Sequence, residues 1–266
     1  MIAGNGRFPV LALEEARQLG HEVVAIGIRE EASPEIDRLA ARTYWVSLGE
    51  LSRLIEILRE EKLTELIMAG QVKHAKIFSS IRPDWRLVKV LASLREKNTD
   101  ALIGGVIGVL EKEGIRVLDS TLLLKPLLAD KGSMSRRKLS SDEERDIRYG
   151  RRVANTLASV DVGQSVVICE RACVAVEAME GTDAVLRRAA ALVNGRALTL
   201  VKVSRRRRHL LFDVPVAGPG TIDTMRETHA TALAVDAGRT LLLDKAEFLR
   251  RADEAEIAVV GTEPEA

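Results

Sequence analysis

The sequence predicts an α/β protein made of two α/β domains: an N-terminal Rossmann-like domain with a parallel sheet and a C-terminal mixed α/β domain. In the first half, short continuous apolar runs alternate with helical patterns, which is typical of parallel strands buried on both faces. A length of 266 residues is comfortable for two domains. A charged stretch with few apolar residues divides the chain. We therefore expect domains at 1–130 and 149–266, joined by a polar linker at 131–148.

The composition excludes several classes of protein. The 40 basic residues nearly balance the 39 acidic ones, so charge does not indicate nucleic acid as a partner. The two cysteines, Cys169 and Cys173, lie within apolar runs and are interpreted as small buried hydrophobic residues, not as a disulfide or a metal site. No apolar run reaches the ~20 residues of a membrane span, and no signal-peptide pattern is present. We therefore expect a cytoplasmic protein that is at most peripheral to a membrane.

Strands and helices alternate through the N-terminal half. Apolar runs predict strands, with their turns, at residues 2–6, 22–28, 43–48, 65–69 and 115–118. Apolar residues at helical spacing predict helices at about 9–19, 50–61, 84–94, 99–113 and 121–129. Gly20 and Gly114 are C-cap candidates, and Asn98 or Thr99 is an N-cap candidate. The first strand looks shortened, so either it is short or the chain begins further upstream.

Two strand ends in this half carry glycines, and ligands of parallel sheets bind beyond the carboxyl ends of the strands. The first GxG resembles the start of a dinucleotide fingerprint, but Pro9 occupies the place of the third glycine. A glycine-rich turn without a ligand is an equal alternative, and His74 is interpreted as an ordinary histidine. The candidate substrate-binding residues in these loops are Gly4, Asn5, Gly6, Gly70, Gln71 and Val72.

The C-terminal half predicts a second α/β unit. A helical pattern spans residues 147–158, and a β-hairpin follows at 165–169 and 173–178. Further strands are predicted at 197–203, 232–235, 240–243 and 256–260, and further helices at 184–193, 222–231 and 245–252.

The stretch from Asp161 to Asp183 is the most informative part of the sequence. Its hairpin delivers Glu177, Glu180 and Asp183 to one end of an element, and polar loops on a stiff scaffold commonly form binding sites. Thr182 or Asp183 is placed to cap the following helix, whose N-terminus attracts anions. We therefore predict a site at this end of the hairpin.

A run of four arginines, Arg205 to Arg208, follows the strand at 197–203. It is either a solvated loop or a contact to phosphate or anionic lipid headgroups; nucleic acid is the least favoured partner, because no aromatic residues interleave with the cations. Asp213 then lies between apolar neighbours, where a lone carboxylate is costly unless it is partnered. Asp213 is therefore a site candidate, with a salt-bridged structural aspartate as the equal alternative.

Several of these segments together resemble one family, the LpxI-type UDP-2,3-diacylglucosamine pyrophosphatases of lipid A synthesis. They occur in the family's order and cover nearly the whole chain, and the match within Asp161 to Asp183 is the most specific. The matching segments are IAGNGRFP at 2–9, AGQV at 69–72, NTDALI at 98–103, DVGQSVV and VEAMEGTD within 161–183, LVKV at 200–203 and FDVPVAGPGTI at 212–222.

The resemblance implies two α/β domains with a cleft between them and a metal-dependent hydrolase. The implied reaction cuts UDP-2,3-diacylglucosamine into UMP and 2,3-diacylglucosamine 1-phosphate, with Asp213 as the catalytic residue. The implied cofactor is Mg²⁺ or another divalent cation, which neutralises phosphate oxygens and accepts a few carboxylates. The metal ligands expected are Glu180, Asp183 and Asp213, and further substrate contacts are Gln164, Thr182 and Lys202, while the glycine loops hold uridine or sugar.

The same resemblance implies a UDP-linked diacyl-sugar as substrate, transient contact with the inner membrane, and a homodimer. No amphipathic helix that could anchor the protein stands out in the sequence. The membrane contact is therefore inferred from the substrate alone.

One loop departs from the family pattern. Where the family runs roughly Lys-Pro-x-Gln-Asp-x-Arg-Phe-Asp, this chain reads RRRRHLLFD from Arg205 to Asp213. Either the substrate differs in its acylation or its sugar, or the activity is weaker. A non-catalytic UDP-sugar or lipid-binding protein of the same fold therefore stays an alternative. A nicotinamide-dependent oxidoreductase is suggested only by the GxG, and it lacks an evident hydride-transfer partner.

Overall fold

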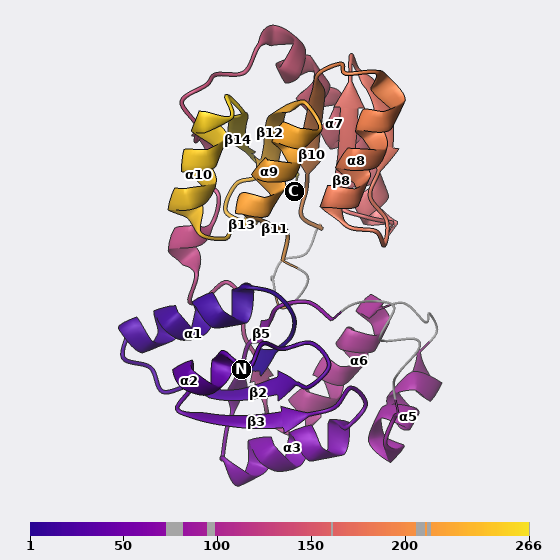
Figure 1. Cartoon of the computed structure of the whole chain (residues 1–266). Helices are drawn as coiled ribbons and strands as arrows, with labels where there is room; N and C mark the ends of the chain where they lie inside the picture. The colour runs from indigo at the N-terminus through magenta and orange to yellow at the C-terminus, as the bar shows by residue number, and fades with distance from the viewer. Residues whose placement is uncertain (73–81, 95–98, 161, 206–210, 212–213, 266) are drawn as a thin grey trace. The chain divides into compact units, whose positions relative to one another are not determined.

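The computed structural model describes the chain except for residues 73–81, 95–98, 161, 206–210, 212–213 and 266 (Figure 1). The chain forms two compact units. Unit 1 comprises Met1–Leu124 and Leu211–Asp213, and unit 2 comprises Lys125–Leu210 and Val214–Ala266. Each unit combines β-sheet with helices, so the predicted fold class, two α/β domains, is confirmed.

Unit 1 is built on a parallel sheet in the order β3-β2-β1-β5. Every residue of β2 is buried, as expected for a strand that is covered on both faces. The chain moves outwards from β1 in one direction to β3 and later pairs β5 on the other side of β1. This reversal is the switch point at which Rossmann-like sheets bind ligands. The strands are β1 (Ile2–Ala3), β2 (Val24–Ile28), β3 (Arg42–Val46) and β5 (Met68–Ala69).

The strand predicted at 65–69 is divided in the structure. Its first half, β4 (Glu65–Leu66), pairs with β6 (Arg116–Val117), whereas β5 pairs with β1. The Leu118 N–H donates to the Leu66 carbonyl at 2.8 Å, and the Ile2 N–H donates to the Ile67 carbonyl at 2.9 Å. The segment therefore links β6 to the parallel sheet, because β4 pairs with β6 and β5 pairs with β1.

Helices α1 (Phe8–Gln18), α2 (Ile36–Leu39), α3 (Leu51–Glu60), α5 (Trp85–Ser93) and α6 (Thr99–Lys112) complete unit 1 (Figure 1). The helix predicted at 121–129 is wrong, because this segment contains turns and the short 3-10 helix η1 (Lys125–Leu127). Lys245 Nζ donates to the carbonyls of Pro126 at 3.2 Å and Leu128 at 2.8 Å. Leu128 also forms an isolated antiparallel bridge with Leu241, a pairing that a residue inside an α-helix cannot make.

Unit 2 contains a mixed sheet in the order β7-β14-β12-β10-β8-β9. Strands β10, β12 and β14 are parallel, whereas β8 is antiparallel to both β10 and β9, and β7 is antiparallel to β14. The predicted hairpin is thus present as β8 and β9. The strands are β7 (Gly132–Ser133), β8 (Ser165–Cys169), β9 (Ala172–Val176), β10 (Leu198–Lys202), β12 (Ala230–Asp236) and β14 (Ala258–Thr262).

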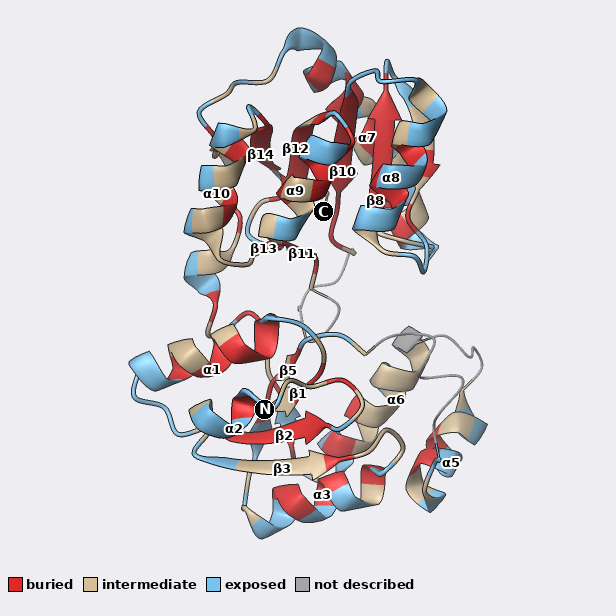
Figure 2. Ribbon diagram, in the orientation of Figure 1, coloured by how far each residue is buried: buried red, intermediate tan, exposed pale blue. Residues whose placement is uncertain are grey.

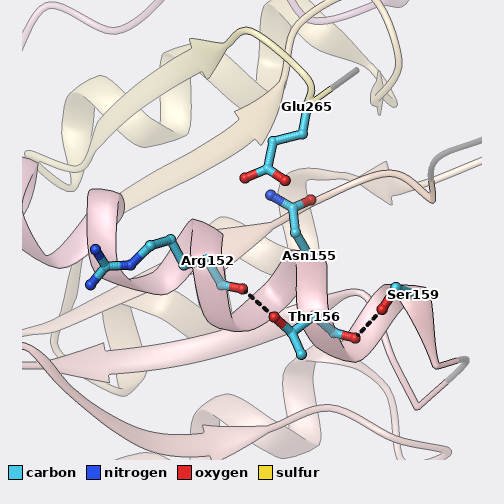
Figure 3. A pocket seen from close by; sticks show the side chains of 5 residues that line it. All are labelled: Arg152, Asn155, Thr156, Ser159 and Glu265. Atoms are coloured by element: carbon cyan, nitrogen blue, oxygen red, sulfur yellow. Dashed lines mark hydrogen bonds between the residues drawn. The ribbon is translucent and has the colours of Figure 1, made fainter.

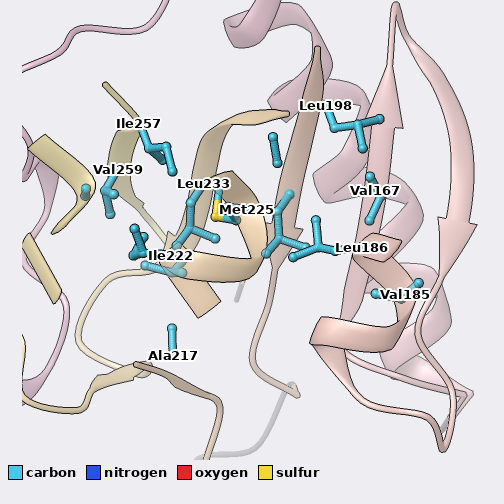
Figure 4. Packing of buried hydrophobic residues seen from close by; sticks show 14 of the residues in the cluster. Val167, Val185, Leu186, Leu198, Ala217, Ile222, Met225, Leu233, Ile257 and Val259 are labelled. Carbon is cyan, nitrogen blue, oxygen red and sulfur yellow. The ribbon is translucent and has the colours of Figure 1, made fainter. Parts of the chain in front are cut away.

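The helices of unit 2 lie on both faces of this sheet. Alternate residues of β8 enter different cores: Val166 and Ile168 pack with α7 (Ser141–Ser159), whereas Val167 packs with the helices of the other face. That second core, shown in Figure 4, includes the buried residues Leu186 and Met225. Figure 2 shows that the strands β8, β10 and β12 are largely buried. The helices of the second core are α8 (Thr182–Val193), α9 (Pro219–Glu227) and α10 (Lys245–Glu254), and a small parallel pair, β11 (Val216–Ala217) and β13 (Leu241–Leu242), adjoins them.

Residues 131–148, predicted to be a linker, are part of unit 2 in the structure. Gly132 and Ser133 form β7, which pairs with β14. Helix α7 starts at Ser141 because Ser140 and Glu143 form a capping box, in which each side chain accepts from the other residue's N–H. The helix therefore begins six residues before the predicted 147, within a stretch whose polar composition resembled a linker.

Helix α9 also differs from its prediction at 222–231. It starts at Pro219, a residue favoured in the first turn, and ends at Glu227. The Thr228 hydroxyl donates to the Thr224 carbonyl at 2.7 Å, and His229 has a φ of 55°, so the helix cannot continue into β12. None of the helices in the described ranges is long and apolar enough to cross a membrane.

Candidate active site

Polar residues converge on one edge of the unit 2 sheet. The carboxyl ends of β10, β12 and β14 share this edge because the three strands are parallel. Strand β8 runs antiparallel to β10, which places its first residue, Ser165, opposite Lys202. Strand β9 returns antiparallel to β8 and ends at Val176, so Glu177 follows at the same edge. The topology thus gathers residues that the sequence predicted on separate elements.

Four of these residues form a hydrogen-bonded group, here called the lysine cluster: Ser165, Glu177, Thr182 and Lys202. Lys202 Nζ donates to Thr182 Oγ1 at 2.9 Å and to Ser165 Oγ at 3.3 Å. Thr182 Oγ1 in turn donates to Glu177 Oε1 at 2.9 Å. Lys202 is 8% exposed and Glu177 is 9% exposed, so the cluster contains a buried cation and a buried carboxylate.

One oxygen of this cluster is not satisfied. Glu177 Oε2 is buried and has no hydrogen-bond partner among the described residues. It lies 3.8 Å from Lys202 Nζ, which is close enough for an ion pair and too far for a hydrogen bond. An ionised oxygen without a hydrogen bond is costly in a buried place. A ligand donor or a cation beside Glu177 would therefore be stabilised.

Helix α8 begins next to the lysine cluster. Its N-cap is Gly181, at φ 87°, and no side chain caps its first N–H groups. The prediction that Thr182 or Asp183 caps this helix is wrong, because both lie inside the helix and the Thr182 hydroxyl donates to Glu177. Uncapped N–H groups at a helix N-terminus favour an anion, and the Lys202 cation adds to this preference.

Asp183, a predicted metal ligand, lies in the first turn of α8. Its side chain is exposed. Partial desolvation nevertheless raises the pKa of its carboxyl group, and the charges of Arg187 and Lys202 oppose this shift. The carboxylate is thus close to the lysine cluster and is accessible to a ligand.

Glu180, another predicted metal ligand, is already engaged within the protein. Its carboxylate accepts from the Ala178 N–H at 2.9 Å and from Arg188 Nη2 at 2.6 Å. Its own backbone N–H and that of Ala178 lower the pKa of this carboxyl group, and Arg188 adds to the effect. Glu180 therefore shapes the turn before α8, and its role as a metal ligand stays a prediction.

The loop before β8 approaches the lysine cluster very closely. A Cβ atom on Gly163 would lie 1.8 Å from the Glu177 carbonyl oxygen, so only glycine fits there. The next residue, Gln164, accepts at its carbonyl from the Val203 N–H at 2.9 Å. The backbone of this loop thus fixes the positions of Glu177 and the end of β10, while substrate binding by Gln164 stays a prediction.

Replacing Gly163 by Ala is expected to destabilise unit 2 by about 2 kcal/mol or more, because the new methyl group forces the backbone of Glu177 to move. Gly220→Ala in α9 is the matched control, since a Cβ there meets nothing within 4 Å. That control should change stability by less than about 1 kcal/mol. Chemical denaturation of both variants checks this, and equal stabilities would contradict the close approach.

A second network at the same edge was missed in the sequence. Asp236 ends β12 and is 1% exposed. Its carboxylate accepts from the Ser204 N–H at 2.7 Å, from Ser204 Oγ at 2.8 Å and from Arg151 Nη1 at 2.7 Å. Arg151 also donates to the Glu263 carbonyl at 2.6 Å. The network anchors the residue that precedes the arginine run. An acid directly after the apolar run at 232–235 was the available signal.

The glycine loops of unit 1 meet at the carboxyl ends of β1 and β5. Asn5 and Gln71 form an isolated antiparallel bridge, with N–H to carbonyl distances of 2.7 and 3.1 Å. A Cβ on Gly4 would lie 2.7 Å from the Gln71 carbonyl oxygen, and a Cβ on Gly70 would lie 2.6 Å from the Asn5 carbonyl oxygen. Gly70 also has a φ of 88°. The structure thus brings the predicted residues Gly4 to Gly6 and Gly70 to Val72 together at the switch point of the sheet.

The side chain of Asn5 has a partner within unit 1. Its Nδ2 donates to Glu31 Oε2 at 3.0 Å, and Glu31 is buried. This bond orients the Asn5 amide at the loop. Contacts of these loops with uridine or a sugar stay a prediction.

The predicted catalytic residue Asp213 lies outside the described residues, as do His74 and residues 206–208 of the arginine run. The chain beside it is described. Leu211 belongs to unit 1, where it packs against the hydrophobic core and its carbonyl accepts from Ser120 Oγ at 2.6 Å. Val214 is again part of unit 2.

Among the residues that the structure describes, no group of three or more His, Cys, Asp or Glu side chains is arranged to hold a metal ion. A pocket of about 300 Å³ lies elsewhere on unit 2 (Figure 3). It contains none of the predicted site residues. Its lining residues are Arg152, Asn155, Thr156, Ser159 and Glu265.

Comparison with solved structures gives only weak likenesses. A biotin carboxylase domain of a thermophilic 2-oxoglutarate carboxylase, bound to ADP, has a TM-score of 0.27 and 10% identity, over 62% of this chain and 33% of that chain. The corresponding domain from Hydrogenobacter thermophilus has a TM-score of 0.27 and 14% identity, over 64% of this chain and 34% of that one. This chain therefore spans about a third of each, and the likeness carries no argument.

Comparison of sequences is specific. Residues 1–127 match the LpxI N-terminal domain, and residues 130–260 match the LpxI C-terminal domain. The UDP-2,3-diacylglucosamine pyrophosphatase LpxI of Caulobacter vibrioides is 31% identical over 275 residues, which covers 100% of this chain and 97% of that protein. These matches confirm the resemblance seen in the sequence: the chain belongs to the LpxI family.

Proposed function

We propose that this chain hydrolyses the pyrophosphate bond of UDP-2,3-diacylglucosamine, giving UMP and 2,3-diacylglucosamine 1-phosphate in lipid A biosynthesis. The full-length relationship to the LpxI pyrophosphatase of Caulobacter vibrioides supports this proposal. The structural observation that carries it is the buried Lys202, held at 2.9 Å from Thr182 beside the uncapped N-terminus of α8. A cation next to such N–H groups favours a pyrophosphate, which is an anion.

The proposed reaction forms a bond from a water oxygen to one phosphorus and breaks the bond from that phosphorus to the bridging oxygen. Negative charge increases on the bridging oxygen as it leaves. In this proposal Lys202 and the N–H groups of α8 bind phosphate oxygens and stabilise this charge. We assign Asp213 to the attacking water, which it would orient and deprotonate. Gln164 is proposed as a further substrate contact.

A divalent cation, proposed as Mg²⁺, would be held by Asp183 and Asp213, with Glu180 as a further candidate ligand. The unsatisfied Glu177 Oε2 near this place fits a site that gains from a positive charge. A few carboxylates together with substrate phosphates are a ligand set that Mg²⁺ accepts. When bound, the ion would neutralise phosphate oxygens.

We further propose where the uridine or sugar of the substrate binds and where the protein meets its membrane-bound substrate. The loops at Gly4 to Gly6 and Gly70 to Val72 would bind uridine or sugar at the switch point of unit 1. The two acyl chains imply that the protein works at the cytoplasmic face of the inner membrane and contacts it transiently. A homodimer is proposed from the resemblance, and sedimentation equilibrium checks it.

Metal removal tests the proposed chemistry. We expect EDTA to stop UMP release from UDP-2,3-diacylglucosamine, and excess Mg²⁺ to restore it. The reason is that the phosphate charges of the substrate are only partly balanced by Lys202. Release at the same rate in EDTA would contradict the role of the metal.

The arginine run supports one alternative, because it replaces polar residues of the family pattern next to Asp213. In this alternative the chain binds UDP-linked diacyl-sugars without hydrolysing them. Equilibrium binding of the substrate without any UMP release, in the presence of Mg²⁺, would favour the alternative over hydrolysis.

A further inference from the structure

Helix α5 presents an apolar and basic stripe to solvent, here called the α5 stripe: Trp85, Val88, Lys89 and Ala92. These residues follow the spacing of one helix face and are all exposed. Trp85 is 59% exposed and Val88 is 49% exposed, although both are large apolar residues. Figure 2 shows the exposed residues of α5. Two exposed apolar side chains one turn apart form a patch that the core of unit 1 does not use.

The opposite face of α5 already holds the helix in place. Leu87 and Val90 are buried, and Leu91 and Leu94 pack against the same core. Gly105 of α6 allows close approach, since a Cβ there would lie 2.6 Å from Val90 Cγ1. The exposure of Trp85 and Val88 is therefore not explained by packing within unit 1.

The N-terminus of α5 fixes the position of Trp85. Asp84 caps the helix and accepts from the N–H groups of Arg86 at 3.0 Å and Leu87 at 2.9 Å. It also accepts from the Ser52 N–H at 2.5 Å, which ties the cap to α3. The indole ring of Trp85 is thus carried by a helix turn that its cap holds in place.

The charges around the stripe are mainly positive. Lys89 Nζ lies 4.6 Å from the centre of the Trp85 ring, and the Arg86 guanidinium lies 5.0 Å from it. Arg82 is exposed just before the helix. Among the described residues, two acids near the stripe have partners within the protein, since Asp84 is the cap and Glu113 pairs with Arg86. An occupant with negative charge is therefore favoured.

We propose that the α5 stripe, together with Arg82, docks unit 1 on an anionic lipid surface. Trp85 and Val88 would enter the interface between headgroups and acyl chains, and the cations would contact phosphates. A second copy of the chain is less favoured, because a two-fold contact through this face would bring two basic stripes together. The inference draws on the proposed function for its purpose, since a diacyl substrate resides in a membrane, but the docking requires no catalysis.

The two tryptophans of the chain, Trp45 and Trp85, allow a direct test. In Trp45→Phe, Trp85 is the sole tryptophan. We expect its emission to shift to the blue when phosphatidylcholine vesicles containing phosphatidylglycerol are added, and to stay unchanged with pure phosphatidylcholine. Sedimentation of the protein with the vesicles measures the affinity without substrate.

Two variants of the full chain separate the apolar and the charged contributions. Trp85→Ala should weaken vesicle binding about tenfold, and Lys89→Glu by a similar factor or more, because each interfacial cation contributes about fivefold. Leu192→Ala and Lys138→Glu are the matched controls. They change an exposed apolar residue and an exposed lysine of unit 2, and they should bind as the unaltered chain does.

Several outcomes would overturn the proposal. These are no binding to anionic vesicles, equal binding to both kinds of vesicle, or equal losses in the variants and their controls. A Trp85→Ala variant that binds vesicles normally but loses self-association would identify the stripe as a contact between copies instead. UMP release without vesicle binding refutes docking alone, and vesicle binding without UMP release refutes only the proposed function.

Discussion

Replacing Lys202 by Met is expected to lower UMP release by about a thousandfold and to destabilise unit 2 by about 3–5 kcal/mol. Both effects have one cause. Met fills a similar volume but removes the cation that lies between Thr182, Ser165 and Glu177. The catalytic loss arises because the phosphate oxygens lose a buried positive charge, and the stability loss arises because the Glu177 carboxylate stays buried without its partner.

A second substitution separates these effects. In the double variant Lys202→Met with Glu177→Gln, the buried negative charge is removed, so most of the stability should return. UMP release should not return, because the cation is still absent. Denaturation and kinetic assays of both variants check this prediction. Recovery of activity together with stability would show that Lys202 acts only in holding the fold, and would contradict its assignment to the substrate.

Replacing Asp213 by Asn should reduce hydrolysis by about a thousandfold or more, while substrate binding falls far less. Asn keeps the shape of the side chain but can neither accept the proton of a water nor bind a metal as a carboxylate does. Stability should be unchanged or slightly higher, because a carboxylate kept for function between residues that are apolar in the sequence costs folding free energy.

The matched control for this variant is Asp142→Asn. Asp142 has 83% of its side chain exposed in the first turn of α7, and it should retain full activity. Rates and dissociation constants of both variants, measured with Mg²⁺ present, check the prediction. Wild-type turnover by Asp213→Asn would remove Asp213 from the proposed chemistry and would favour Glu177 or Asp183 in its place.

Local patterns predicted much of the fold. The run VAIGI of β2 is apolar throughout and is buried throughout, and the alternation around Glu170 and Arg171 gave the hairpin of β8 and β9. Both arise from short-range periodicity, which a sequence displays directly. The structure of residues 131–148 could not be predicted from composition. There, β7 depends on pairing with β14, which lies more than a hundred residues later, and the start of α7 depends on the capping box of Ser140 and Glu143.

The candidate site also has one part that the sequence indicated and another that it did not. Thr182 and Asp183 were singled out by their place before a helical pattern, and Lys202 through the resemblance. The ion pair of Arg151 with Asp236 joins residues 85 positions apart, and although an acid after an apolar run marks Asp236, no local pattern shows that Arg151 is its partner. The close approach of Gly163 to Glu177 is likewise a property of the folded backbone. Interactions that depend on which strands become neighbours are thus the part that the sequence does not display.

The identity of the products tests the central claim most directly. The chain is incubated with UDP-2,3-diacylglucosamine and Mg²⁺, and the products are separated, identified by mass spectrometry and quantified. We predict UMP and 2,3-diacylglucosamine 1-phosphate in equal amounts, because the bond that breaks joins one phosphorus atom to the bridging oxygen. UDP with a free diacylglucosamine, which would indicate cleavage at the sugar, or an unchanged substrate that stays bound, would contradict the account.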